Sequence, residues 1–311
     1  MTVAVAESAA ASAAAASARK AFLVGLAIAV TGAILFSTKA IVAKLIYRYN
    51  VDAVTLIAFR MLFSLPFFLV IALWKMRTQP SLSNSERGRI LVLGLLGYYL
   101  SSFLDFLGLQ YISAGLERLI LFLTPSFVLL ISALFLKKKI TPLEWGALLI
   151  SYVGMLLVFV HDARTGGANV LLGASMVLGA AVSYALYLLA SGEMVRRVGV
   201  LRLVSYAMCV SSAACIGQFF LLRPAALLVQ PMEVYWLSMF NAFFCTVLPV
   251  LMTMIAVARI GASTASQAGM VGPVSTLFLG AMILNEPITG IQLAGTVLVL
   301  AGIYLLSRKK A

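Results

Sequence analysis

The segment PSFVLLISALFLKKKIT, residues 125–141, has a counterpart later in the chain, PVSTLFLGAMILNEPIT, residues 273–289. Each copy is an apolar run that ends in a polar turn, and the two copies are offset by 148 residues. Identical residues at this offset include Ala133 and Ala281, Ile140 and Ile288, and, beyond the quoted segments, Gly154 and Gly302. Self-similarity at a fixed offset is typical of a duplicated unit, so the sequence predicts two copies of one fold.

The composition around this repeat indicates a membrane protein. Of the 311 residues, 63% are hydrophobic and 11% are charged, and the mean hydropathy is +1.07. Soluble domains are only about half apolar and about a quarter charged. Apolar runs of about 20 residues can cross a hydrocarbon core about 30 Å thick. We therefore predict an all-α membrane protein with ten transmembrane helices, near residues 22–46, 53–74, 90–110, 115–136, 143–160, 170–191, 203–222, 234–258, 264–284 and 288–307.

The basic residues predict the orientation of these helices. Sixteen of the 23 Lys and Arg residues lie at the termini and in every second connection. Because cytoplasmic loops are enriched in Lys and Arg, we expect both termini in the cytoplasm. The two halves, residues 21–160 and 161–311, then hold five spans each. An odd number inverts the second half relative to the first, which is an arrangement typical of secondary transporters.

The first 20 residues are expected to lie outside the membrane. They are rich in alanine and serine, and Arg19 and Lys20 follow the apolar stretch. A secretory signal carries its positive residues first. We therefore expect residues 1–20 to form a disordered cytoplasmic tail rather than a leader.

The inventory of reactive side chains excludes several classes of function. The three cysteines lie in apolar runs and are expected to be buried free thiols, and His161 is the single histidine, so we expect no metal and no cofactor. No phosphate-binding GxxxxGK[ST] loop occurs, so the chain is not expected to hydrolyse ATP. The net charge of +13 is distributed over connections rather than one basic face, which argues against nucleic acid as a partner.

The stretch GLQYISAGLERLILFLTPSFVLLISALFLKKKITPLEWGALLISYVGMLLVF, residues 108–159, resembles the EamA domain of the drug/metabolite transporter superfamily. The matching parts are the Gly-Leu-x-Tyr-x-Ser-Ala entry, the Thr124-Pro125 interruption, Thr141-Pro142 at the last helix, Phe59-Arg60, and the Asn285-Glu286-Pro287 turn of the second copy. The first copy departs from this pattern because it has Lys137-Lys138-Lys139 where an acidic turn is usual. The resemblance implies a bacterial exporter of small metabolites in the inner membrane. Within the family, the sequence is similar to the YddG-type aromatic amino-acid exporters.

Five of the ionisable residues inside predicted spans of the first half draw attention, namely Lys39, Arg60, Asp105, Glu117 and Arg118. A charged side chain at the bilayer centre costs roughly 2.5–3.5 kcal/mol on insertion scales, so each needs a partner or a function. We expect all five at a similar depth. Three cations against two carboxylates leave one positive charge that would attract a substrate carboxylate. The alternative is a structural ion-pair network, with Arg60, Glu117 and Arg118 serving in pairing or coupling.

Polar and aromatic residues predict the lining of a cavity. In the third helix Tyr98, Ser101, Ser102 and Asp105 follow the spacing of one helix face, with Tyr99 beside them. Further candidates in the second half are Tyr184, Tyr187, Asn241 and Gln267, with Thr246 as an additional polar group. The alternatives are hydrogen bonds between helices for the serines and interfacial anchoring for the tyrosines.

Matched helix interruptions predict hinges. Pro125 in the first copy and Gly272-Pro273 in the second occupy equivalent places, and a proline removes one helical hydrogen bond. Interruptions at corresponding positions of two repeats are pointers to a transport site.

These observations favour a secondary exporter of small metabolites, with amino acids, including aromatic ones, as the first expectation. Transport would proceed by alternating access through a cavity between the repeats, driven by the gradient of the solute or by protons at Asp105 or Glu117. We expect a monomer whose partners are the small-molecule substrate and the lipid bilayer. The alternatives are an exporter of another organic solute or drug, a membrane channel or scaffold, and, disfavoured by the thin inventory of acid and base groups, a membrane enzyme.

Overall fold

The computed structural model describes residues 2–137, 139–165, 167 and 169–308. All regular structure in these residues is helical, and no strand occurs among them, which confirms the predicted all-α class. Eight helices in this part of the chain are long and apolar enough to cross a membrane. Two shorter apolar helices, Val271–Leu284 and Gly290–Leu305, lie where the ninth and tenth spans were predicted.

The first half of the chain runs through α1 (Thr2–Tyr47), α2 (Ala53–Thr78), α3 (Asn84–Gly94), the π-helical segment η1 (Leu95–Leu100), α4 (Ser101–Leu109), α5 (Ala114–Leu121), α6 (Thr124–Leu136) and α7 (Pro142–Thr165). The second half runs through α8 (Val170–Val198), α9 (Val200–Leu222), the short 3-10 helix η2 (Ala225–Leu228), α10 (Met232–Ala242), the π-helical segment η3 (Phe243–Val247), α11 (Leu248–Ala268), α12 (Val271–Leu279), the π-helical segment η4 (Gly280–Leu284) and α13 (Gly290–Arg308).

The boundaries of these elements repeat at the offset found in the sequence. The starts of α3 and α10, of η1 and η3, and of α7 and α13 are each separated by 148 residues. Two left-handed residues obey the same offset, since Lys137 has φ 52° and Asn285 has φ 59°. The duplication therefore extends to the π-helical turn and the turn after the fourth span, which are local features that a chance resemblance would not reproduce.

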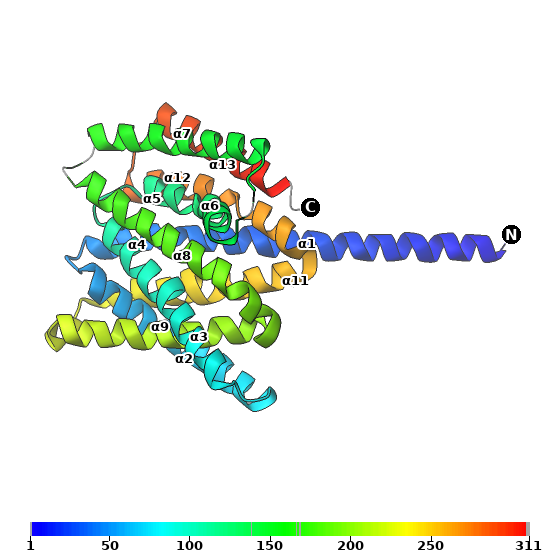
Figure 1. Ribbon diagram of the computed structural model, residues 1–311, viewed down its shortest axis with the longest axis horizontal. Coiled ribbons are helices and arrows are strands. Elements are labelled where there is room, and N and C mark those ends of the chain that lie inside the picture. Colours follow the sequence, from blue (N-terminus) through cyan, green and yellow to red (C-terminus); the bar gives the residue numbers. More distant parts are fainter. Residues whose placement is uncertain (1, 138, 166, 168, 309–311) are drawn as a thin grey trace.

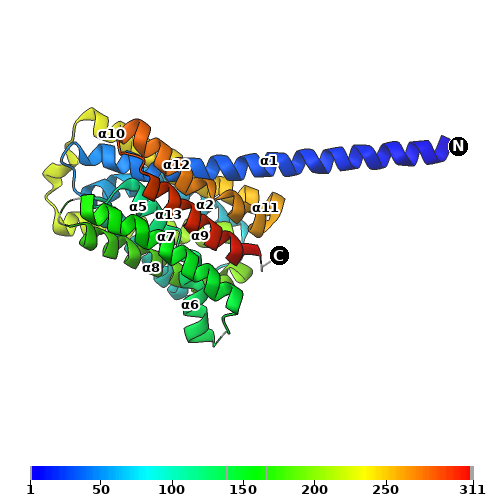
Figure 2. The same ribbon diagram turned by 90° about the horizontal axis from the view of Figure 1, so that it is seen from above.

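The packing of the helices has the same internal symmetry. The main contacts join α1 to α11 and α12, α8 to α4 and α6, α2 to α9, and α7 to α13. Exchanging every helix for its counterpart in the other half leaves this set unchanged. The pairing of α7 with α13 is visible in both views of the molecule (Figures 1 and 2). The two halves thus pack around an approximate twofold relation, with α2 and α9 on one side and α7 and α13 on the other.

The structure differs from the expectation for the first 20 residues. Helix α1 begins at Thr2, and its first turns project beyond the other helices (Figure 1). Alanine has the highest helix propensity. This alanine-rich stretch therefore continues the helix of the first membrane span toward the N-terminus. The composition rich in alanine and serine, which we interpreted as a disordered tail, forms helix instead.

Two other boundaries also differ from those predicted. The third span begins at Asn84, because Ser83 and Glu86 form a capping box that starts α3 before its apolar run. The predicted helix 264–284 is divided, since α11 continues to Ala268 and α12 begins at Val271. Proline is tolerated in the first turn of a helix, so Pro273 fits the beginning of α12 rather than the interior of one long helix.

The connection between α1 and α2 is fixed by Asp52. Its carboxylate accepts hydrogen bonds from the backbone N–H of Val54 (3.0 Å) and the hydroxyl of Thr55 (2.6 Å), and it lies 3.2 Å from Nε of Arg223. Burial alone would raise the pKa of this carboxyl. The hydrogen bonds from Thr55 and the charge of Arg223 outweigh that effect and hold the pKa below its ordinary value.

We expect Asp52→Asn to make the stability of the protein less dependent on pH. A carboxyl with a lowered pKa stabilises the fold fully above its ordinary pKa of about 4, and this contribution is lost as the pH falls through the folded-state value. Thermal unfolding in detergent should therefore show a lower midpoint for the variant at pH 7 and a flatter decline toward pH 3. Glu233→Gln, at an exposed carboxylate in the first turn of α10, is the control. An unaltered pH profile for Asp52→Asn would contradict this role.

Candidate functional site

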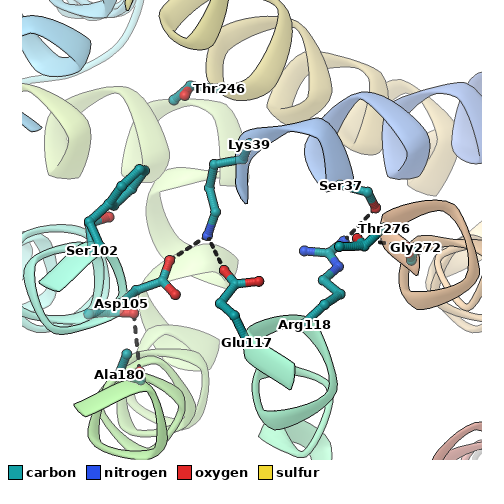
Figure 3. A network of polar contacts seen from close by, with 12 residues as sticks. Ser37, Lys39, Ser102, Asp105, Glu117, Arg118, Ala180, Thr246, Gly272 and Thr276 are labelled. Atoms are coloured by element: carbon teal, nitrogen blue, oxygen red, sulfur yellow. Dashed lines mark hydrogen bonds and ion pairs between the residues drawn. The ribbon is translucent and has the colours of Figure 1, made fainter. Parts of the chain in front are cut away.

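A cluster of buried charges lies where helices α1, α4 and α5 meet. Nζ of Lys39 donates a hydrogen bond to Asp105 and lies 3.1 Å from Oε1 of Glu117. Figure 3 shows the lysine side chain extending between the two carboxylates. The exposed fractions are 4% for Lys39, 4% for Asp105 and 0% for Glu117, so this ion pair is shielded from solvent. One ammonium group therefore joins three helices of the first half.

The start of helix α5 positions Glu117. Ser113 is the N-cap residue, and its hydroxyl accepts a hydrogen bond from the N–H of Leu116 (3.1 Å) while donating one to Asp162 (2.6 Å). Glu117 follows in the first turn. A carboxylate is stabilised there because the N-terminal end of a helix carries a partial positive charge.

The turn of the second half also holds α5 in place. The carboxylate of Glu286 accepts a hydrogen bond from the backbone N–H of Ala114 (3.2 Å) and lies 3.5 Å from Nζ of Lys44. Asn285, in the left-handed conformation, makes the turn that directs Glu286 toward α5. The Asn-Glu-Pro turn of one repeat thus caps the helix of the other repeat that carries Glu117.

Arg60 reaches the cluster from α2 and contacts both halves of the protein. Its Nε donates to Oγ1 of Thr246 in η3 (2.8 Å), and its Nη1 donates to Oγ of Ser102 (3.4 Å). The guanidinium lies over the ring of Phe106, 5.0 Å from its centre, and Lys39 lies over the same ring at 5.3 Å. Both cations therefore share the ring of Phe106, whose quadrupole attracts positive charge.

Arg118 lies on the other side of Glu117 and faces the second half. Its Nη2 donates to Oγ of Ser37 (3.1 Å), and its guanidinium lies over the ring of Phe36 at 4.9 Å. Figure 3 shows the guanidinium beside Ser37, Gly272 and Thr276. A Cβ atom added to Gly272 would lie 2.7 Å from Nη2 of Arg118, so glycine is the residue that permits this close approach.

The cluster retains polar atoms without partners. Oδ1 of Asp105, Oε2 of Glu117 and Nε of Arg118 are buried and have no hydrogen bond within the described residues. Buried polar groups are costly unless they are paired. Three cations, Lys39, Arg60 and Arg118, face two carboxylates, which leaves a net charge of one positive unit. The arrangement can therefore accept an added anionic group and still offers carboxylate oxygens to a donor.

Three tyrosines form a second cluster between η1 and α8. The hydroxyl oxygens of Tyr98 and Tyr187 are 3.2 Å apart, and the rings of Tyr184 and Tyr187 stack with centres 5.5 Å apart. Tyr98 meets both rings at steep angles. At the offset of 148 residues, Tyr187 is the counterpart of Lys39. Equivalent positions in the two halves thus carry aromatic hydroxyls in one half and a charge in the other.

The predicted polar face of the third span is divided between two neighbours. Tyr98 and Ser101 face α8, where Ser101 donates to the carbonyl of Ala180 (3.1 Å), while Ser102 and Asp105 face α2 and α1. Adjacent residues of an α-helix point about 100° apart, so Ser101 and Ser102 in α4 meet different neighbouring helices. Ser101 therefore makes a hydrogen bond between helices, which was the alternative to a role in the cavity lining.

The side chains of the remaining predicted residues make no hydrogen bond or ion pair with the charge cluster among the described residues. Tyr99 stacks on Phe103 with ring centres 6.4 Å apart, and the side chain of Asn241 is fully buried in α10 with no hydrogen bond among the described residues. Gln267 belongs to α11, but its side chain lies outside the described part. Pro125 and Pro273 each lie in the first turn of a helix, α6 and α12.

The sequence interpretation missed three contacts of the cluster, which are Ser37, Phe36 and Phe106. Ser37 and Phe36 precede Lys39 in α1 by less than one turn, and Phe106 follows Asp105 directly. Their proximity to charged residues was the available signal. A described pocket lies elsewhere in the molecule and is formed by residues 79–82 and 197–199 with Glu86 and Arg202. Within the described residues, no three His, Cys, Asp or Glu side chains are grouped as metal ligands.

Comparison with known proteins agrees with this architecture. The family model for the EamA-like transporter family matches twice, over residues 23–160 and 171–308. The chain belongs to the EamA-like transporter family. The two matched regions correspond to the two halves of the structure, so the resemblance stated from the sequence is confirmed at the level of the family. This EamA-like transporter is thus a multi-pass membrane transporter of small solutes.

Individual relatives support the same assignment. The chain is 30% identical over 271 residues to "Uncharacterized transporter YcbK" of Bacillus subtilis, covering 85% of this chain and 86% of that protein. An "Uncharacterized transporter" of Archaeoglobus fulgidus is 28% identical over 222 residues, covering 71% and 78%. A solved crystal structure matches with a TM-score of 0.64 at 18% identity over 92% of this chain and 98% of its own, which shows the shared fold.

We expect Lys39→Met to destabilise this EamA-like transporter by about 3–5 kcal/mol, because it leaves two buried carboxylates without their cation. Adding Asp105→Asn and Glu117→Gln to the same protein should recover most of that loss. Reversible unfolding in mixed detergent micelles measures both changes. Lys44→Met removes a partly exposed pair with Glu286 and should cost less than about 1 kcal/mol. Equal losses for the two lysine variants would contradict a central role for Lys39.

Proposed function

We propose that this transporter is a secondary exporter of small zwitterionic metabolites, with amino acids, including aromatic ones, as its substrates. The observation that carries the proposal is the position of the charge cluster between the repeats. The charged side chains come from the first half, whereas Thr246 and Gly272, which contact Arg60 and Arg118, come from the second. A solute bound among these groups would touch both halves at once.

This position supports transport by alternating access. Rocking of one half against the other would separate Arg60 from Thr246 and Arg118 from Gly272, since each of these contacts joins the two halves. The matched first-turn positions of Pro125 and Pro273 make the beginnings of α6 and α12 the proposed hinges. The internal symmetry of the helix contacts supports such a motion, because symmetric halves can exchange conformations.

The chemistry of the cluster supports a zwitterionic solute. The surplus positive charge and the unpartnered Nε of Arg118 suit a carboxylate, and the free oxygens of Asp105 and Glu117 suit an ammonium group. Arginine presents a planar fork that matches a carboxylate in a bidentate manner. The rings of Phe36 and Phe106 already line these cations and offer an apolar surface to an aromatic side chain.

The proposed topology has ten spans with both termini in the cytoplasm of a bacterium, in its inner membrane. In this arrangement α12 with η4 and α13 form the ninth and tenth spans. The distribution of Lys and Arg supports the orientation. Because the charge cluster is built from one chain, we propose that a monomer is sufficient for transport.

Counterflow in liposomes tests the proposal. Vesicles containing the purified protein and loaded with unlabelled tryptophan or threonine should accumulate the labelled amino acid transiently, and the uptake should saturate. Nucleotide sugars and organic cations are the control solutes. Exclusive exchange of a control solute would retain the carrier and reject the amino-acid assignment, whereas ohmic conductance without counterflow would indicate a channel.

The same assay tests the site. Lys39→Ala, Asp105→Asn and Tyr98→Ala should each reduce counterflow strongly, because they alter the charge cluster or the adjacent tyrosine cluster. Arg77→Ala, which removes an exposed charge at the end of α2, should retain the rate of the parent protein. Unimpaired counterflow in all three site variants would reject the proposed cavity.

We expect Gly272→Ala to weaken the apparent affinity for amino acids by at least about tenfold, since an added methyl group displaces the guanidinium of Arg118 and a hydrogen bond to a charged group is worth about 1.5–3 kcal/mol. Gly146→Ala is the matched control, because a Cβ added there meets no atom within 4 Å. Concentration-dependent counterflow measures both. If the two variants retain the same affinity, Gly272 does not position Arg118 for substrate.

A further inference from the structure

A polar pocket with a volume of about 380 Å³ lies away from the charge cluster. Residues 79–82, in the connection between α2 and α3, form one wall, and residues 197–199, between α8 and α9, form another, with Glu86 and Arg202 completing it. Its size is in the range of cavities that bind small molecules. The function proposed above makes no use of it.

Arg202 is the buried charge of this pocket. Arg202 is only 5% exposed. Its Nη2 donates a hydrogen bond to the carbonyl of Pro80 (2.7 Å), and its guanidinium lies 5.5 Å from the ring centre of Tyr206. Its Nε is buried without a hydrogen bond, and no carboxylate of the described residues lies within ion-pair distance. Burying an unpaired charge is costly, so this guanidinium is suited to an external anion.

The nearby acidic residues are engaged elsewhere. Glu86 accepts hydrogen bonds from the N–H (2.9 Å) and hydroxyl (3.0 Å) of Ser83 in the capping box of α3. Glu193 lies 2.6 Å from Nη2 of Arg197 and 3.3 Å from Nη1 of Arg89. These carboxylates stabilise a helix start and fix two surface arginines. Glu86 interacts with the charge of Arg202 at longer range, but neither carboxylate lies within ion-pair distance of it.

The pocket also lies beside groups that are typical of a membrane surface. It adjoins the end of α2, where Trp74 is 54% exposed and Nζ of Lys75 lies 4.3 Å from the centre of its ring. Tryptophan is enriched at the level of lipid headgroups, and basic residues next to a span attract anionic lipids. A ligand that enters this pocket from the bilayer would be a lipid headgroup.

We propose that this pocket binds the phosphate of an anionic phospholipid headgroup, with Arg202 as its principal anion ligand and Arg197 and Ser81 at its entrance. A guanidinium matches phosphate oxygens through two parallel hydrogen bonds. The volume exceeds that of a bare phosphate and leaves room for a glycerol group. The site depends on the location in a membrane and not on which solute is exported.

Ligand-dependent thermal stability of the full-length protein in a neutral detergent tests the proposal. The probes are short-chain phosphatidylglycerol, short-chain phosphatidylcholine and sodium phosphate. A ligand of the folded state raises the unfolding midpoint in a saturable manner. We expect phosphatidylglycerol to do so, Arg202→Gln to weaken its apparent affinity at least about tenfold, and Arg87→Gln to leave it unchanged, since Arg87 is exposed at the same end outside the pocket.

A second pair of variants keeps the test valid if Arg202→Gln does not fold. Ser81→Glu places a negative charge at the pocket and should abolish the stabilisation, whereas Ser85→Glu, on the exposed surface of α3, should not. Equal stabilisation by sodium phosphate alone would overturn the lipid as the source of the phosphate. Equal stabilisation by phosphatidylcholine, or equal losses in the matched variants, would overturn the site.

Discussion

The ion pair that Lys39 forms with Asp105 and Glu117 is the constraint on which the rest of the site depends. A single charge in a membrane interior is costly, and so are two adjacent carboxylates. Each group is tolerated because the other two are present, which requires helices α1, α4 and α5 to keep one relative position. Arg60 and Arg118 then occupy the two sides of this fixed centre. The second half contributes Thr246, which contacts Arg60, and Gly272, which contacts Arg118.

Duplication has produced a symmetric scaffold with asymmetric chemistry. Element boundaries, π-helical turns and left-handed residues repeat at one offset, yet Lys39 corresponds to Tyr187 and Lys138 to Glu286. The backbone is constrained in both halves by the same packing. Side chains at equivalent positions are free to differ, so one repeat carries the charges and the other supplies glycine, hydroxyl groups and the acidic cap of α5.

Much of the fold was predictable from the sequence because hydrophobic length and self-similarity are properties of the linear chain. The class, the repeat and most helix positions follow from them, and the proximity of Lys39, Asp105 and Glu117 follows from their similar depth. The division of the polar face of the third span was not predictable, since the spacing of Ser101 and Ser102 does not show which neighbouring helix meets each of them. The approach of Arg118 to Gly272 depends on tertiary packing. The helical start of α1 was misjudged because an alanine-rich segment suits both a helix and a disordered tail.

The π-helical segments η1 and η3 have a consequence for how this fold tolerates change in chain length. In a regular α-helix, removal of one residue turns every side chain that follows by about 100°. A π-helical turn closes its hydrogen bond over one residue more than an α-helical turn, so removal of one residue from Leu95–Leu100 would convert this turn to α-helix. At these two turns, therefore, a single codon deletion would leave the side chains that follow, Asp105 among them, close to their present orientation.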